Sequence, residues 1–75
     1  MPRLPVVSGK EAVRAFTKVG WQVSRQEGSH IILSKSGNPV ILVMPDHREV
    51  RRGTLRSLIR QAGLAVKEFK SLLED

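Results

Sequence analysis

The sequence predicts a small α+β domain, a two-layer sandwich with elements in the order α-β-β-β-α-α and a short last helix. Two patterns predict it. Near both ends of the chain, apolar residues recur at helical spacing. In the middle of the chain, apolar and polar residues alternate or Val and Ile are frequent, as in strands. In this order the helices pack on one face of a three-stranded antiparallel sheet and leave the other face open. Because 75 residues suffice for one core, we expect residues 1–75 to form a single domain.

The first helix is predicted to begin after Ser8. The segment Ser8-Gly9-Lys10-Glu11 has the form of a capping box, in which the first and last side chains satisfy each other's backbone amides. Apolar residues then follow at helical spacing, at Ala12, Val13, Phe16 and Val19. Gly20 ends this helix, since glycine adopts the left-handed conformation that terminates helices.

Three strands are predicted to follow. In residues 21–26, apolar and polar side chains alternate with a period of two, which places Trp21 and Val23 inward. Glu27 and Gly28 form a turn, residues 29–34 a second strand, residues 35–38 a hairpin loop and residues 39–44 a third strand rich in Val and Ile. The strands therefore form an antiparallel meander.

Two helices complete the predicted fold after a basic loop at residues 45–53. Thr54 caps or opens the first of them, and Gly63 ends it. Its apolar positions follow helical spacing, at Leu55, Leu58, Ile59 and Ala62. Residues 64–73 form the short last helix, in which Ala65 is a poor cap. Its buried side is predicted to consist of Val66, Phe69, Leu72 and Leu73.

Positive charge is abundant and concentrated. Thirteen Lys and Arg against seven Asp and Glu give a net charge of +6, which favours polyanionic partners. One short stretch contains a single acid, Glu49, and five arginines, Arg48, Arg51, Arg52, Arg56 and Arg60. Acids gather instead near the C-terminus, at Glu68, Glu74 and Asp75. Arg52, Arg56 and Arg60 are four apart, so they line one edge of a helix as a stripe suited to phosphates. The alternative interpretation is a solvated polar helix face.

His30 is the residue best suited to chemistry. If Ile31 and Leu33 point toward the helices, then His30, Ile32 and Ser34 point to the open face. Ile32 would share that face with either Ile41 and Val43 or Val40 and Leu42, an apolar patch that suggests a protein partner or stacking bases. His30 could act as the general base for a ribose 2′-hydroxyl or as the acid for the departing 5′-oxygen. The alternative is an ordinary surface histidine; His47, in the basic loop, is a second candidate.

Several functional classes are disfavoured by what the sequence lacks. It has no cysteine, which excludes thiol chemistry and favours a cytoplasmic location. There is no HExxH motif, no paired carboxylates and no glycine-rich phosphate loop, so we expect no metal and no cofactor. The segment Met1-Pro2-Arg3-Leu4-Pro5 lacks the apolar core of a signal peptide, and no apolar run approaches membrane-spanning length. We therefore expect no association with a membrane.

The order of motifs resembles the HicA family of toxins, the mRNA interferases of bacterial type II toxin-antitoxin modules. The resemblance covers nearly the whole chain and is carried by Ser8-Gly9-Lys10-Glu11, Gly20-Trp21, Gly28-Ser29-His30, Pro45-Asp46-His47, Gly53-Thr54-Leu55-Arg56 and Gln61-Ala62-Gly63-Leu64. It implies a fold like that of double-stranded-RNA-binding domains, metal-independent RNA cleavage and inhibition by a HicB-type antitoxin. The family's catalytic histidine maps onto His30. The chain departs from the family at Ile31, often a second polar residue, and at Ala65, often a Ser or Thr cap.

The leading hypothesis is therefore a cytoplasmic endoribonuclease, monomeric when free, that cleaves mRNA with His30 as its general acid or base and needs no cofactor. The residues expected to hold RNA are Lys10, Arg25, Ser29, Lys35, Arg52, Arg56 and Arg60. A second hypothesis is a non-catalytic RNA-binding module with the same fold, whose binding would be sensitive to salt. A third is a protein-interaction domain that uses the open sheet face.

Overall fold

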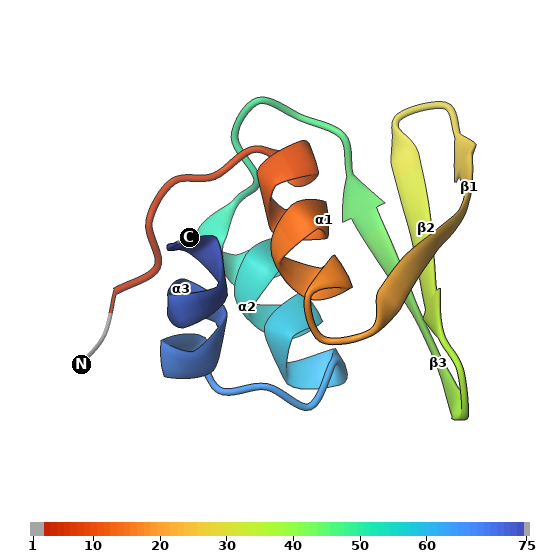
Figure 1. Cartoon of the computed structure of the whole chain (residues 1–75). Helices are drawn as coiled ribbons and strands as arrows, with labels where there is room; N and C mark the ends of the chain where they lie inside the picture. The colour runs from red at the N-terminus through yellow and green to blue at the C-terminus, as the bar shows by residue number, and fades with distance from the viewer. Residues whose placement is uncertain (1–2, 75) are drawn as a thin grey trace.

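The computed structural model describes residues 3–74, so the predictions made for Met1, Pro2 and Asp75 lie outside the described residues. The elements follow the predicted order: α1 (Gly9–Thr17), β1 (Trp21–Glu27), β2 (His30–Lys35), β3 (Asn38–Pro45), α2 (Arg52–Gln61) and α3 (Val66–Leu73). The sheet is antiparallel with the strand order β1-β2-β3, and the three helices lie on one side of it (Figure 1). The predicted fold class is thus confirmed. Among residues 3–74, no helix is long and apolar enough to cross a membrane.

The predicted start of α1 is confirmed. The Ser8 backbone N–H donates to Glu11 Oε1 over 2.8 Å, and the Glu11 N–H donates to Ser8 Oγ over 3.1 Å. These two bonds satisfy amides that have no partner inside the helix. Beyond the last turn, Gly20 adopts a φ of 98°, which side-chain-bearing residues rarely reach. The chain therefore reverses directly into β1.

The two later helices begin elsewhere than predicted. α2 begins at Arg52 rather than at Thr54, and its N-cap, Arg51, makes no side-chain capping bond. The prediction placed the start at a favourable capping residue, but here the helix starts where the preceding loop docks. α3 begins at Val66 rather than at residue 64, because Ala65 is extended. Half of a capping box stabilises that start, since the Ala65 N–H donates to Glu68 Oε1 over 2.8 Å.

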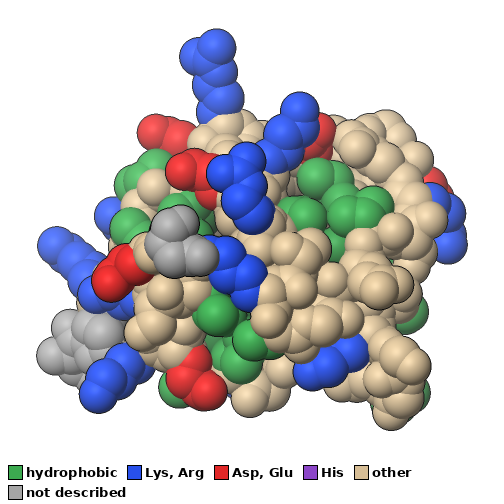
Figure 2. Space-filling model, in the orientation of Figure 1, with side chains coloured by type: hydrophobic (Ala, Val, Ile, Leu, Met, Phe, Trp, Pro, Cys, Tyr) green, Lys and Arg blue, Asp and Glu red, His purple; other side chains and the backbone are tan. Residues whose placement is uncertain are grey.

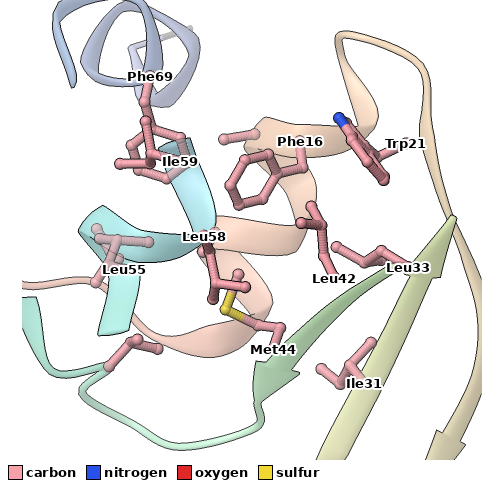
Figure 3. Packing of buried hydrophobic residues seen from close by; sticks show 14 of the residues in the cluster. Phe16, Trp21, Ile31, Leu33, Leu42, Met44, Leu55, Leu58, Ile59 and Phe69 are labelled. Carbon is pink, nitrogen blue, oxygen red and sulfur yellow. The ribbon is translucent and has the colours of Figure 1, made fainter. Parts of the chain in front are cut away.

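The core lies between the helices and the inner face of the sheet. Phe16 of α1 and Phe69 of α3 are fully buried, with ring centroids 5.1 Å apart (Figure 3). Trp21 is buried at 1% exposure, as predicted. The chain outside the helices and strands also contributes Leu4, Val7 and Val50 to the core. The Val50 N–H donates to the Val7 carbonyl over 2.8 Å, so the N-terminal segment is bound to the loop that precedes α2.

The outer face of the sheet is open, and its apolar residues can now be assigned. Leu33 pairs with Leu42, and both are fully buried. By alternation, Ile41 and Val43 are the residues that share the outer face with Ile32. Ile41 and Val43 are about half exposed, whereas Ile32, on the central strand, is 8% exposed.

Val23 shares the inner face with its register partner Leu33, as predicted, but it is 50% exposed rather than buried. Val23 lies on the edge strand β1, immediately before a break in the register with β2. An edge strand has a neighbour on one side only, so its side chains are less covered than those of the central strand. Trp21, at the start of the strand, packs into the core, whereas the strand beyond it is exposed.

Candidate active site

His30 is the first residue of β2 and follows a two-residue turn formed by Gly28 and Ser29. Gly28 has a φ of 59°, and Ser29 does not share its positive φ. Glycine at the first position with such a φ is the signature of a type II′ turn, which matches the twist of the strands it joins. The turn therefore lies one residue later than predicted, since β1 continues through Glu27. The glycine sets the backbone that presents the imidazole.

A small hydrogen-bond network fixes this turn against the end of β3. The side-chain amide of Gln26 donates to the Gly28 carbonyl over 3.1 Å and to Asp46 Oδ2 over 3.0 Å. The Asp46 backbone N–H in turn donates to the Ser29 carbonyl over 2.7 Å. Both carbonyls of the turn thus have donors. His30 is held on a braced hairpin rather than on a loose loop.

The start of α1 packs against the same end of the sheet. The Gly9 N–H donates to the His47 carbonyl over 2.9 Å. A Cβ on Gly9 would come within 2.1 Å of the Pro45 carbonyl oxygen, so only glycine fits this approach. Lys10 follows directly and is exposed, as is His47. Both candidates therefore lie at the end of the molecule that carries Ser29 and His30.

His30 has charged neighbours on β1, and its register partner on β3 is Pro45. His30 pairs with Glu27, and the neighbouring Ile32 pairs with Arg25. Arg25 Nε donates to a carboxylate oxygen of Glu27, and their side chains are 64% and 58% exposed. Within residues 3–74, the exposed imidazole of His30 makes no hydrogen bond or ion pair. It is therefore available to a ligand.

The arginine stripe and Lys35 are not brought to His30. Arg52, Arg56 and Arg60 are exposed on α2, in the helix layer behind the sheet, whereas His30 belongs to the outer face. Arg52 also donates from Nε to the Leu4 carbonyl over 2.8 Å, so it secures the N-terminal segment. Lys35 lies at the far end of β2, roughly 17 Å along the strand from His30, and its side chain lies against Gly20. The residues expected to hold RNA are therefore not all gathered around His30.

The one side of the molecule seen in Figure 2 carries basic side chains over the helices and no visible histidine. A groove of about 290 Å³ opens between the N-terminal segment, α1 and α3. Its lining comprises Pro5, Val6, Val7, Glu11, Arg14, Ala15, Lys18, Leu72 and Leu73. None of these residues belongs to the hairpin that bears His30. This groove is therefore separate from the candidate active site, where His30, Glu27 and Arg25 are exposed.

Sequence reasoning missed the residues that position His30. Gln26 and Asp46 are twenty residues apart, and nothing in the sequence links the Asp46 of the Pro45-Asp46-His47 motif to Gln26. Glu27 was assigned only to a turn. The available signal was the hairpin itself, since residues on either side of a two-residue turn face each other across the strands.

Residues 9–64 match the family model of the HicA toxin of bacterial toxin-antitoxin systems. Among solved structures, the chain is similar to one from a toxin-antitoxin complex from Streptococcus pneumoniae, with 36% identity and a TM-score of 0.69. That similarity covers 77% of this chain and 98% of the other. No curated protein matches it. Since the family match spans well over half of the sequence and includes the braced hairpin, the chain belongs to the HicA toxin family of bacterial toxin-antitoxin systems.

Proposed function

We propose that this HicA toxin is a cytoplasmic endoribonuclease that cleaves mRNA without a metal ion, with His30 as a proton-transfer group, and that a HicB-type antitoxin neutralises it. One observation carries the proposal: the only imidazole on the outer sheet face is exposed, unpartnered among residues 3–74 and mounted on a braced turn. Positioning of this kind is what proton-transfer catalysis requires. Members of the family generally act as ribonucleases, which supports the same reaction.

Side chains of this protein can supply the proton transfers that the reaction requires. The ribose 2′-oxygen loses its proton to a base and forms a bond to the adjacent phosphorus. The bond from phosphorus to the 5′-oxygen breaks, and an acid protonates that oxygen. The products are a 2′,3′-cyclic phosphate and a 5′-hydroxyl. Imidazole can fill either role near neutral pH.

The proposed RNA-binding residues form two groups. Lys10, Arg25 and Ser29 lie at the His30 end of the molecule, and His47 is a second candidate for contact there. The remaining residues, Lys35, Arg52, Arg56 and Arg60, lie elsewhere on the surface. The segment at residues 46–51 joins the hairpin end to α2 and carries Arg48 and Arg51. An RNA that contacts His30 and the stripe together would run along this segment.

The test compares the purified wild type with His30→Ala on single-stranded RNA in the presence of a chelator. We expect the variant to lose a factor of about 10²–10⁴ in cleavage rate, the usual contribution of a general acid or base. The wild-type product should carry a 2′,3′-cyclic phosphate. Equal rates for the two proteins would refute the role of His30, and loss of wild-type cleavage in chelator would refute the metal-independent reaction.

A second candidate function is RNA binding without cleavage. The arginines of α2 favour it, because Arg56 and Arg60 make no ion pair within residues 3–74 and Glu49 is the only acid in their stretch. Affinity from such residues comes from counterion release and falls steeply with salt. Salt-sensitive binding by a wild type that leaves RNA intact would favour this function over the nuclease.

The antitoxin is tested separately. An equimolar HicB-type protein encoded with this chain should copurify with it and abolish cleavage. Failure to bind or to inhibit would refute the proposed partner without bearing on the nuclease. The similar chain from Streptococcus pneumoniae comes from a toxin-antitoxin complex, which supports the expectation.

A further inference from the structure

Glu27 lies directly opposite His30 across the turn. The two residues are register partners of β1 and β2 and flank Gly28 and Ser29. Partners in an antiparallel pair project to the same face with Cβ atoms about 4.5–5.5 Å apart. The outer sheet face therefore carries a carboxylate beside the imidazole, on the same braced hairpin.

The carboxylate is exposed and oriented. Arg25 Nε donates to it, and both side chains are more than half exposed. The terminal amino groups of Arg25 make no hydrogen bond within residues 3–74, so they are available to a phosphate oxygen. Around the pair, the other charged or titratable groups are Asp46 and His47 after β3 and Lys10 at the start of α1. Asp46 is occupied by Gln26, and His47 lies on the loop rather than in the strand register.

Cleavage through the 2′-oxygen needs two groups, one to take a proton and one to give a proton on the other side of the phosphorus. A carboxylate has no proton to give, whereas an imidazolium does. An exposed Glu and His facing each other across a turn can therefore flank one phosphate. This pairing assigns the base to Glu27 and the acid to His30. Considered alone, His30 could fill either role.

We propose that Glu27 is a second catalytic residue, the general base, and that His30 is the general acid; this inference rests on the proposed nuclease function. Glu27 takes the proton of the 2′-hydroxyl as the 2′-oxygen bonds to phosphorus. His30 gives its proton to the 5′-oxygen as the bond from phosphorus to that oxygen breaks. Arg25 holds a non-bridging oxygen of the same phosphate. Protons and electron pairs balance within the RNA and these two side chains.

The test compares Glu27→Gln with Glu74→Gln, which removes the same charge from an exposed residue at the end of α3, away from the hairpin and from residues 46–51. Glutamine keeps an oxygen that can accept from Arg25, so the hairpin should remain intact, and thermal unfolding of both variants checks this. Single-turnover cleavage of one RNA is measured over pH in chelator, together with RNA affinity.

We expect Glu27→Gln to cleave about 10²–10⁴ times more slowly than Glu74→Gln, while binding RNA equally well or more tightly because a negative charge has been removed. The acidic limb of the pH–rate profile, which reports the base, should disappear, and the basic limb, which reports His30, should remain. Glu27→Asp should recover part of the rate. If Glu27 only repels RNA, Glu27→Gln will instead cleave at least as fast as the control.

The outcomes separate the two proposals. A full rate in Glu27→Gln together with a large loss in His30→Ala overturns the role of Glu27 and leaves the nuclease assignment standing. Full rates in both variants, or no cleavage by the wild type, overturn both. Retention of the acidic limb in a slow Glu27→Gln variant also overturns the role of Glu27 as base.

Discussion

The outer sheet face and the exposed side of α2 differ in what they offer to RNA. The sheet face carries an imidazole and a carboxylate, and its one nearby arginine, Arg25, is already paired with Glu27. α2 carries Arg56 and Arg60 without acidic partners within residues 3–74 and has no histidine or carboxylate of its own. The first surface is thus suited to proton transfer and the second to phosphate binding. Under the proposed function, RNA capture would fall to the helix layer and chemistry to the sheet.

The two regions also differ in how they are held. The hairpin is braced by hydrogen bonds from Gln26 and Asp46. α2 is held by apolar packing of Leu55, Leu58 and Ile59. Perturbing the hydrogen bonds should therefore affect chemistry alone, whereas perturbing the shared core should affect both regions.

The largest effect is expected from Phe69→Ala, which removes the ring packed against Phe16. Truncating a fully buried Phe costs about 3–5 kcal/mol, a large part of the stability of a small domain. Hydrogen exchange should show protection falling together in α2 and in the hairpin. Loss confined to one of the two regions would show that they do not share a core.

Gly9→Ala should weaken the hairpin end selectively. The new Cβ would meet the Pro45 carbonyl at 2.1 Å, and such overpacking costs about 1–3 kcal/mol. Gly53→Ala is the control, because nothing lies within 4 Å of its added Cβ and alanine favours a helix interior by about 0.5–1 kcal/mol. Thermal unfolding should separate the two, with Gly9→Ala melting lower and Gly53→Ala at or above the wild type. Equal melting temperatures would contradict the close approach.

Gln26→Leu should reduce cleavage without reducing RNA affinity. It removes both donors that the Gln26 side chain supplies to the turn and to Asp46, at about 0.5–1.5 kcal/mol each. Gln22→Leu on the same strand is the matched control, since Gln22 makes no side-chain hydrogen bond within residues 3–74. Amide exchange at Asp46 should accelerate only in Gln26→Leu. Similar exchange and cleavage in both variants would contradict the bracing role.

The smallest effect concerns pH and the start of α1. Hydrogen bonds from Ser8 hold the pKa of Glu11 below its ordinary value; the bond from the Ser8 backbone has the larger effect and the bond from the Ser8 hydroxyl the smaller. A lowered folded-state pKa stabilises the fold above the ordinary pKa of Glu, and this stabilisation is lost as pH falls through the folded pKa. The advantage of wild type over Glu11→Gln, which keeps the acceptor but does not titrate, should therefore shrink as pH falls below about 4. A melting-temperature gap that widens toward low pH would contradict this.

The sequence predicted the fold class, the order of elements and the capping of α1, because these depend on local periodicity and on neighbours three residues apart. It missed the start of α2 at Arg52 and the exposure of Val23, because loop docking and the covering of an edge strand depend on distant contacts. For the site, alternation placed His30 on the outer face. Helical spacing grouped the arginines of α2, but it could not say which way α2 faces relative to His30. Partners such as Gln26 and Asp46 emerge only when the fold brings them together.

The division between capture and chemistry is tested most directly by comparing His30→Ala with the double variant Arg56→Ala/Arg60→Ala in two assays, RNA affinity against salt and single-turnover cleavage at saturating protein. We predict that His30→Ala binds like the wild type and loses cleavage. The arginine variant should bind more weakly, with a salt slope shallower by about 1.4 for two phosphate contacts on a single strand, and should cleave at the wild-type rate once saturated. A saturated rate that falls as far in the arginine variant as in His30→Ala would contradict the division, as would cleavage by His30→Ala at the wild-type rate.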